Sequence, residues 1–426
     1  MGNYLNVGNA GFETIRNGLY VDKTEMISFI NSTLNTTDKL TVVSRPRRFG
    51  KSFAAKMLCA YYDKSCDSHG LFEGLAISKD ASFEKYLNRY NVIYLDITLF
   101  ISRASNIRDV VRNINNMLMI EIDEAFQDVQ RGSDLAETLV RVTKSTGEKF
   151  IMIIDEWDAL FREAKNDAGL QKEYIDLLRG LFKSSWTDII FAGAYMTGIL
   201  PIKKYGNQSA VSDFREHTML APKKLAKYVG FTEPEVKALC RQYDMEFNEM
   251  KYWYDGYSFS KLKSVYNPNS VMEAIKSEEF GSYWTRTETY ESIKFYIELD
   301  FDGLKEAVVQ MLGGAHIKID VETFQNDMIE INSRDNVLTL LVHLGYLAYD
   351  IGSKSVYIPN EEVREEFVRA VSVGKHKEIA KLIHNSDHLL EVTLNMDETA
   401  VAAAIEEAHK AGTVPTFYNN EQACAV

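Results

Sequence analysis

The first half of the chain alternates short apolar runs with longer stretches in which apolar residues recur every three or four positions. The short runs predict strands and the longer stretches predict helices, because side chains return to the same face after two residues in a strand and after about 3.6 in a helix. The run 150–154 is apolar at every position, which is typical of a strand that helices cover on both faces. The predicted strands are 39–43, 91–97, 150–154 and 188–192, with 217–220 as a candidate fifth, and the predicted helices are 51–62, 108–129, 134–144 and 170–183. Strands separated by helices predict a parallel sheet with right-handed crossovers.

After Pro222 the pattern changes to helices with few strands. Thr232 and Glu235 have the spacing of a helix start, with a capping Thr and an acid three positions further on. The run 338–347 predicts a helix, and 355–359 predicts a short hairpin after a turn. Together these two segments resemble a small winged-helix-like module.

The length of 426 residues predicts two to three domains, since one domain commonly takes about 150 residues. A hydrophobic fraction of 46%, a charged fraction of 26% and only 7 Pro exclude collagenous, low-complexity and largely disordered chains. From Leu389 the chain is acidic, with a predicted helix over 398–410. We therefore expect an α/β domain over 1–222, a mostly helical, winged-helix-like domain over 223–388 and an acidic tail over 389–426.

Positive charge is concentrated at the start of a chain that is acidic as a whole. The net charge of −13 argues against a protein that wraps nucleic acid through its overall field, but residues 1–60 carry eight Lys or Arg against four Asp or Glu. The four cysteines lack the spacing of a zinc site or a disulfide framework, which favours a reducing compartment. The longest nearly apolar stretch, 189–200, has about 12 residues against about 20 for a membrane helix. We expect a cytoplasmic protein without a membrane partner.

A phosphate-binding loop is predicted between the first strand and the helix that follows it. The segment from Arg45 to Ser52 matches the pattern GxxxxGK[ST] except at its first position, where Arg45 replaces Gly. Gly50 would turn backbone N–H groups inward at the helix N-terminus, Lys51 would reach the β- and γ-phosphates of ATP, and Ser52 would ligate Mg²⁺. The alternative is a basic loop that contains Gly-Lys-Ser by chance.

The apolar strand 150–154 is followed by two acids, Asp155 and Glu156. A buried strand of this kind delivers an acid to a metal at its carboxyl end. Asp155 would hold Mg²⁺ through water, and Glu156 would orient the attacking water or accept its proton. Adjacent acids also cap helices after a strand, particularly with Asp158 two residues further on, so a structural role is the alternative.

A third candidate, Thr197, lies just beyond the fourth predicted strand. In phosphate-loop folds that carry a glutamate beside the metal-binding aspartate, this strand lies between the strands of the other two motifs. Thr197 would then contact the γ-phosphate or hold the attacking water. The alternative is that Thr197 and Gly198 simply turn the chain.

Together these segments resemble the AAA-ATPase-like family of bacterial predicted ATPases over roughly residues 10 to 420. The segments that carry the resemblance are RPRRFGKS at 45–52, YVDKT at 20–24, DEWD at 155–158, TGILP at 197–201, WYDGY at 253–257, YNP at 266–268, YW at 283–284, GYL at 345–347 and IPNEEV at 358–363. Arg45 agrees with this family, which usually shows Arg at that position. The predicted nucleotide-binding residues are Arg45, Pro46, Arg47, Arg48, Phe49, Gly50, Lys51, Ser52 and Phe53.

The resemblance also implies a PD-(D/E)xK nuclease-like domain, into which members of the family typically continue. Residues 409–421 resemble the segment that leads into that domain, but the strand-borne acids and lysine of a nuclease site are absent from the sequence. We therefore expect no nuclease activity from this chain. The segment 22–24 is interpreted as a helix start or as part of the adenine pocket, and the segment 254–257 as a tight turn packed by aromatic rings.

Two functional interpretations remain open. The first is a Mg²⁺-dependent ATPase whose second half passes a conformational change to a nucleic-acid or protein partner, with oligomerisation as an option. The second is a nucleotide-dependent switch that hydrolyses ATP slowly or not at all. Glu156 favours hydrolysis, whereas the absence of a well-supported arginine finger, for which Arg215 and Arg286 are candidates, favours slow turnover.

Overall fold

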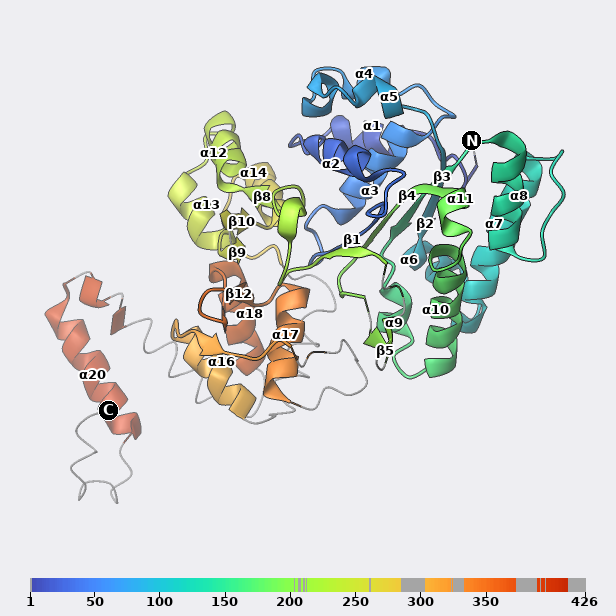
Figure 1. The fold of residues 1–426 in the computed structure, drawn as a ribbon. Coiled ribbons are helices and arrows are strands. Elements are labelled where there is room, and N and C mark those ends of the chain that lie inside the picture. Colours follow the sequence, from blue (N-terminus) through green and yellow to red (C-terminus); the bar gives the residue numbers. More distant parts are fainter. Residues whose placement is uncertain are drawn as a thin grey trace.

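The computed structural model describes residues 2–202, 204–205, 208–209, 211, 213–259, 262–284, 303–322, 324, 333–372, 389–390, 392–394 and 396–412. A five-stranded sheet in the order β2-β3-β4-β1-β7 forms its N-terminal part, and all neighbouring strands in it run parallel (Figure 1). The strands are β1 Leu40–Ser44, β2 Asn91–Asp96, β3 Phe150–Asp155, β4 Phe191–Gly198 and β7 Arg215–His217. The predicted parallel sheet is thereby confirmed, with β4 between β3 and β1.

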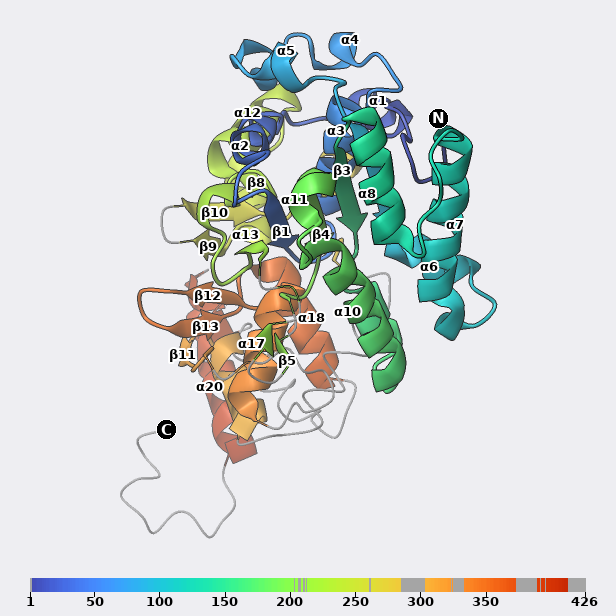
Figure 2. The ribbon, with the colours of Figure 1, turned by 45° about the vertical axis from the view of Figure 1, so that its right-hand side comes forward.

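Helices cover both faces of this sheet because its buried strands alternate side chains between two apolar clusters. In β3, Ile151 and Ile153 join the cluster that includes α3, whereas Met152 and Ile154 join the cluster that includes α7, α8 and α10. Figure 2 shows α3 and α8 on opposite sides of β3. The longer helices are α1 Ala10–Arg16, α2 Glu25–Thr33, α3 Lys51–Tyr62, α7 Val110–Ala125, α8 Leu135–Thr146 and α10 Ala168–Phe182. Shorter elements are α4 His69–Phe72, η1 Ala76–Lys79, α5 Phe83–Tyr86, α6 Ile97–Arg103, η2 Ile107–Asp109, α9 Ala159–Glu163, α11 Thr187–Ile190, β5 Lys204–Tyr205, β6 Gln208–Ser209 and η3 Lys223–Leu225.

The strand predicted at 188–192 is partly wrong. Residues 187–190 form the short helix α11, and the strand begins at Phe191 and continues to Gly198. Lys39 explains the difference, because its amine contacts the Thr187 carbonyl and the Asp188 carboxylate and so holds this turn beside the start of β1. The fifth predicted strand is also displaced, because it lies at Arg215–His217 and ends where residues 218–221 turn.

The part of the chain after 222 is mostly helical and carries two small antiparallel sheets. Thr232 and Glu235 form the predicted capping box of α12. Helix α17 is followed by the hairpin β12–β13, which β11 extends to three strands, as expected for a winged-helix-like module. The elements are β8 Phe231–Thr232, α12 Glu233–Gln242, α13 Phe247–Tyr254, β9 Tyr257–Phe259, β10 Leu262–Tyr266, α14 Pro268–Ser277, α16 Leu304–Leu312, β11 Ile317–Lys318, α17 Arg334–Leu344, β12 Ala348–Asp350, β13 Ser355–Tyr357, α18 Glu361–Ser372 and α20 Glu398–Gly412.

The two parts of the chain share apolar packing. One buried cluster runs from α1, α2 and α3 through one face of the sheet and into β9, α16, α17 and α18. The division at residue 222 stays a prediction, since this cluster crosses it. No helix among the described residues combines the length and the apolar character that crossing a membrane requires.

The turn between α13 and β9 packs tightly against the segment before α18. Gly256 has a φ of +119°, and a Cβ added there would lie 1.8 Å from the carbonyl oxygen of Pro359. The Tyr357 hydroxyl donates to the Gly256 carbonyl over 2.9 Å, and the Asn360 amide donates to the Asp255 carbonyl over 2.7 Å. These contacts agree with the interpretation of this segment as a packed turn.

We therefore predict that Gly256→Ala strongly destabilises the protein. The backbone strain alone should cost about 1–3 kcal/mol, and the clash with Pro359 adds to it. Chemical denaturation followed by circular dichroism measures the change. Gly180→Ala, in the last turn of α10 with no atom within 4 Å of the added Cβ, is the control and should leave stability unchanged or raise it. Equal midpoints for the parent and Gly256→Ala would contradict the prediction.

Candidate functional site

The predicted phosphate-binding loop joins β1 to α3 at the carboxyl end of the sheet. Gly50 has a φ of +87° and precedes the first helical residue, Lys51. This left-handed conformation favours Gly and directs the chain into the helix. The first backbone N–H groups of α3 therefore face the loop, which is the arrangement that binds phosphate.

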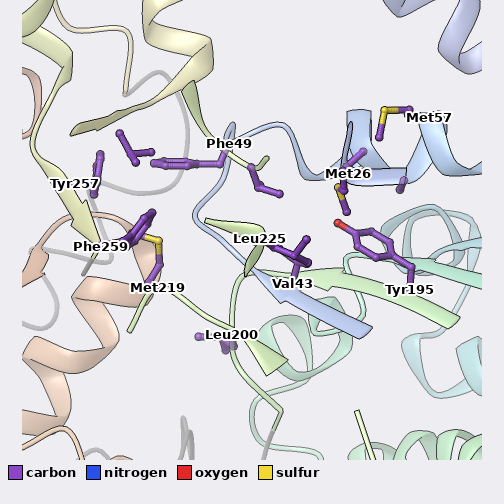
Figure 3. Close-up of a cluster of buried hydrophobic side chains, with 14 of the residues drawn as sticks. Met26, Val43, Phe49, Met57, Tyr195, Leu200, Met219, Leu225, Tyr257 and Phe259 are labelled. Atoms are coloured by element: carbon purple, nitrogen blue, oxygen red, sulfur yellow. The ribbon is translucent and has the colours of Figure 1, made fainter. Parts of the chain in front are cut away.

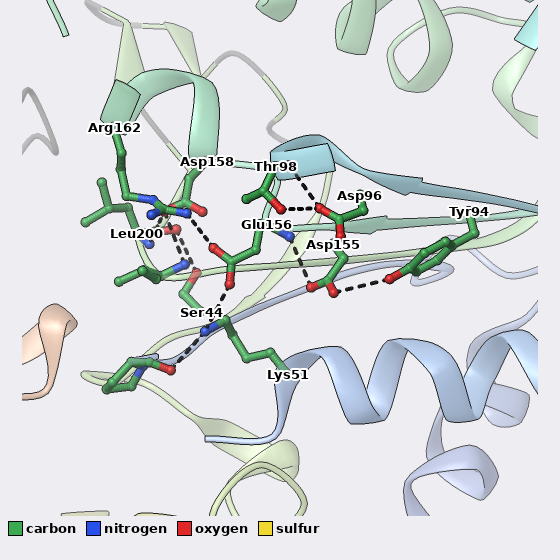
Figure 4. Close-up of polar contacts among 12 residues, drawn as sticks. Ser44, Lys51, Tyr94, Asp96, Thr98, Asp155, Glu156, Asp158, Arg162 and Leu200 are labelled. Carbon is green, nitrogen blue, oxygen red and sulfur yellow. Dashed lines mark hydrogen bonds and ion pairs between the residues drawn. The ribbon is translucent and has the colours of Figure 1, made fainter. Parts of the chain in front are cut away.

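The Lys51 amine lies inside the loop rather than in solvent. It donates to the carbonyl of Pro46 over 2.9 Å and pairs with Glu156 Oε1 over 3.4 Å (Figure 4). Its side chain is 3% exposed, and the Glu156 side chain is 19% exposed. The loop and the end of β3 thus meet through this ion pair.

Asp155 is buried at the end of β3. Burial raises the pKa of its carboxyl group to about 6, although a hydrogen bond with the Ser52 side chain lowers it. The Tyr94 hydroxyl and the Glu156 backbone N–H also donate to this carboxylate, over 3.4 Å and 3.1 Å. The structure therefore brings Ser52 and Asp155 together, the two residues predicted to hold Mg²⁺.

These two side chains offer the ligand chemistry that Mg²⁺ prefers, a carboxylate and a hydroxyl oxygen. The described residues contain no group of three or more His, Cys, Asp or Glu side chains that could hold a metal ion. A Mg²⁺ bound here would take its remaining ligands from phosphate oxygens and water, as is usual for this ion. The donors at Ser52 and Asp155 fit such a site.

Glu156 adopts an unusual backbone conformation, with a φ of +51°. Its carboxylate pairs with both Lys51 and Arg162. Burial opposes the charge, but these two cations outweigh it and lower the pKa of Glu156. A strained, ionised and partly exposed carboxylate next to a buried strand has the properties of a functional group.

Thr197, near the end of β4, is fully buried, and its hydroxyl has no hydrogen-bond partner in the described part of the chain. Its carbonyl accepts from the Trp157 backbone N–H over 2.9 Å. Since β4 lies between β3 and β1, Thr197 lies between the loop and the acid pair in the sheet order. The Thr197 hydroxyl can therefore still donate or accept a hydrogen bond.

Several other residues of the loop contact the part of the chain after 222. The buried Arg45 guanidinium donates to the His217 carbonyl over 3.1 Å and lies 5.2 Å from the Phe259 ring centroid. A Cβ added at Gly345 would lie 2.7 Å from the Pro46 side chain, so the backbone there contacts the loop directly. These two side chains therefore face the second part of the protein.

Arg48 and Phe49 make similar contacts. The Arg48 guanidinium donates to the Tyr283 carbonyl over 2.6 Å. Phe49 is buried, and its ring packs edge-on against Tyr257 with centroids 5.2 Å apart (Figure 3). Phe53, by contrast, is 53% exposed on α3. Among the predicted nucleotide-binding residues, Lys51 and Ser52 face the acids after β3, and Gly50 precedes them at the helix start. Arg47 is near enough to Glu156 to lower the pKa of its carboxyl group. Phe49 packs into the core.

Two residues of the site were not predicted from the sequence as functional. Asp158, which the sequence indicated only as a cap, accepts from the backbone N–H groups of Ile199 and Leu200, and Arg162 pairs with both Glu156 and Asp158. The spacing of four residues between Asp158 and Arg162 on a helix was the available signal.

Neither arginine-finger candidate is placed at this site. Arg215 pairs with Asp38, before the start of β1 and thus at the opposite end of the sheet, and Arg286 lies outside the described residues. The segment 22–24 makes structural contacts: Asp22 accepts from the Ala76 backbone N–H and Lys23 pairs with Glu235 on α12. Helix α2 begins at Glu25, as expected.

A parallel sheet with a phosphate loop after β1, an acid pair after β3 and β4 between them defines a P-loop NTPase. Residues 6–206 match the model of the AAA-ATPase-like family, described as "Predicted AAA-ATPase". The resemblance seen in the sequence is thereby confirmed over these residues, which at the coarse level are those of a P-loop ATPase. No curated protein matches the chain.

Solved structures similar to the chain have low identities. The Aeropyrum pernix ORC2 protein in ADPNP-ADP complexes is 13% identical, with 84% of this chain and 96% of that chain covered and a TM-score of 0.34. AMPPCP-bound DnaA from Aquifex aeolicus is 10% identical, with 92% and 97% covered and a TM-score of 0.27. C. elegans PCH-2 is 12% identical, with 78% and 71% covered and a TM-score of 0.26.

Glu362, a buried acid on α18, contacts the loop indirectly through the backbone of Tyr283. The Tyr283 backbone N–H donates to Glu362 Oε1 over 2.8 Å, and the carbonyl of the same Tyr283 accepts from Arg48. Glu362 is fully buried, and burial raises its pKa from 4.5 to about 7. The protonated form therefore stabilises the fold fully below about pH 4.5, and this contribution is lost as the pH rises through about 7.

We predict that Glu362→Gln removes this pH dependence. Between pH 5 and 8 the parent should lose up to roughly 3 kcal/mol more of its unfolding free energy than the variant, because only the parent must ionise the buried Glu362 carboxyl group. Urea denaturation at several pH values measures the difference. Glu365→Gln, one turn away and 35% exposed, is the control and should follow the parent. Identical pH profiles for the parent and Glu362→Gln would contradict the prediction.

Proposed function

We propose that this chain binds ATP with Mg²⁺, hydrolyses it, and uses the cycle to change the arrangement of the part after residue 222. The proposal rests on one observation. Lys51 and Ser52 lie close to Asp155 and Glu156 at the carboxyl end of the parallel sheet. Phosphate oxygens, a metal-binding carboxylate and a base are required at the same place in this reaction. The family of residues 6–206 supports the same conclusion.

Each residue of the site has a distinct task in this proposal. The Lys51 amine would exchange its present acceptors, the Pro46 carbonyl and Glu156, for oxygens of the β- and γ-phosphates. Ser52 and Asp155 would hold Mg²⁺, which when bound supplies positive charge against the phosphate oxygens. Glu156 would take a proton from the water that attacks the γ-phosphorus, while the bond from that phosphorus to the ADP oxygen breaks.

Thr197 would support the same step. Its buried hydroxyl has no partner among the described residues and lies on the strand between β1 and β3. This hydroxyl would hold the attacking water or an oxygen of the γ-phosphate. The backbone N–H groups at the start of α3 would bind the remaining phosphate oxygens, as they do at helix N-termini generally.

Coupling to the second part of the chain is supported by the loop itself. Arg45, Pro46, Arg48 and Phe49 contact residues after 216, so a shift of the loop on ATP binding would reach those residues directly. The partner that responds to this change would be a nucleic acid or a protein, and assembly into an oligomer is compatible with the proposal.

A second candidate function is a nucleotide-dependent switch with little turnover. One observation favours it: both Lys51 and Arg162 neutralise Glu156 in the structure, and a carboxylate paired with cations is a weaker base. Neither arginine-finger candidate from the sequence is placed at the site, because Arg215 pairs with Asp38 and Arg286 lies outside the described residues. Such an arginine can contribute about 10³–10⁵ in rate.

Lys51→Ala is predicted to weaken ATP binding while the protein stays folded. Loss of a charged hydrogen-bond donor of this kind should reduce affinity about 10- to 100-fold, because the phosphates lose their main protein cation. Isothermal titration calorimetry measures the affinity. Lys56→Ala, an exposed lysine on the same helix, is the control and should bind like the parent. Unchanged binding by a folded Lys51→Ala protein would show that the loop is not the phosphate site.

Glu156→Gln and Asp155→Asn are predicted to separate base and metal roles. Glu156→Gln should bind ATP and Mg²⁺ normally but hydrolyse ATP about 10²–10⁴ times more slowly, since it loses the positioned base. Asp155→Asn should lose both Mg²⁺-dependent affinity and turnover. Single-turnover hydrolysis and nucleotide binding, with ATP and GTP and with and without DNA, measure both effects. The switch function would be favoured if Glu156→Gln hydrolysed ATP at the parent rate, or if the parent showed no turnover.

A further inference from the structure

Arg162 lies between the two acids that follow β3 and contacts both of them. Its Nη2 donates to Glu156 Oε2, and its Nε lies 3.3 Å from Asp158 Oδ2 (Figure 4). Only 11% of its side chain is exposed. A guanidinium offers several donors in a fixed plane, so one side chain can hold two carboxylates at a set separation.

The two oxygens of Glu156 have different surroundings. Oε2 accepts from Arg162, whereas Oε1 faces the Lys51 amine at 3.4 Å. The Lys51 amine would turn to the phosphates when ATP binds, so Arg162 would then be the cation hydrogen-bonded to Glu156, with Arg47 also nearby. One oxygen would stay fixed, and the oxygen on the phosphate side would be free to accept a proton.

Asp158 connects the same arginine to the end of β4. Its Oδ2 accepts from the Ile199 and Leu200 backbone N–H groups over 3.1 Å and 2.9 Å. A Cβ added at Gly198 would lie 2.5 Å from Asp158 Oδ1, so the acid packs directly against this turn. Arg162 therefore contacts both the proposed base and the group that supports the turn after Thr197.

We propose that Arg162 is the positioning residue for Glu156, and that it aims the free oxygen of this carboxylate at the attacking water. Arg162 does not contact the substrate in this assignment, and the inference rests on the proposed ATPase function. Its effect on hydrolysis passes through Glu156. A residue that acts through another shows no further effect once the other is removed.

A double-mutant cycle tests this dependence. Arg162→Gln should lower the single-turnover hydrolysis rate about 10- to 100-fold, as expected for a misplaced catalytic group, with ATP affinity within a few-fold of the parent. Arg162→Lys, which keeps the charge but cannot bridge both acids, should recover part of the loss. In the Glu156→Gln background, Arg162→Gln should cause no further loss. Arg179→Gln, a partly exposed arginine on α10 paired with Asp176, is the matched control and should behave like the parent.

The outcomes separate this inference from the function on which it rests. Losses that multiply in the double variant, or a parent-like rate in folded Arg162→Gln, would overturn the positioning role of Arg162 while leaving the ATPase function intact. Absence of turnover in the parent would overturn the proposed function and this inference with it. Circular dichroism reports whether each variant is folded. If Arg162→Gln is unfolded, the cycle is run with Arg162→Lys, to which the same multiplicative and non-multiplicative outcomes apply.

Discussion

The ion pair between Lys51 and Glu156 joins two segments that are far apart in the chain, the phosphate loop after β1 and the acid pair after β3. Buried charges need partners, and each member of this pair has a second one: the Pro46 carbonyl for Lys51 and Arg162 for Glu156. In the structure, the Glu156 carboxylate is therefore the anion that faces the Lys51 amine. In the proposed function, a triphosphate in the loop would offer stronger anionic acceptors to the lysine and would leave Glu156 paired with Arg162 and near Arg47. The same contact that stabilises the free protein thus defines where the substrate charge would lie.

The loop has two faces with different tasks. Its helix end carries Lys51, which faces Glu156, and its strand end presents Arg45, Pro46 and Phe49 to the part after 216. This explains why Arg45 can replace the first glycine of the pattern: its side chain lies in the core against Phe259 instead of on the phosphate side. Packing against residues after 216 fixes this end of the loop, so a nucleotide bound in the loop as proposed would be linked to the second part through these contacts.

The predictions from sequence succeeded where a local pattern carries the information. The helix 51–62 was predicted with its observed bounds, and the acid pair at 155–156 was assigned to a strand end because an apolar run precedes it. The strand at 188–192 was misplaced because the contact of Lys39 with Asp188, which holds a helical turn there, is not visible in an apolar run. Arg162 was missed for a similar reason, since its contact with Glu156 depends on the turn geometry after β3.

By itself the sequence determined the alternation of strands and helices, the loop with Gly50, Lys51 and Ser52, and the acids that follow the third strand, because these features depend on periodicity and on residues next to one another. Only the tertiary structure decided which of the loop side chains lie beside the acid pair and which face the core. It also placed β4 between β1 and β3 and left the Thr197 hydroxyl buried without a partner in the described chain. The physical reason is that strand order, burial and ion pairing depend on contacts between segments distant in sequence, and local patterns carry no record of these contacts.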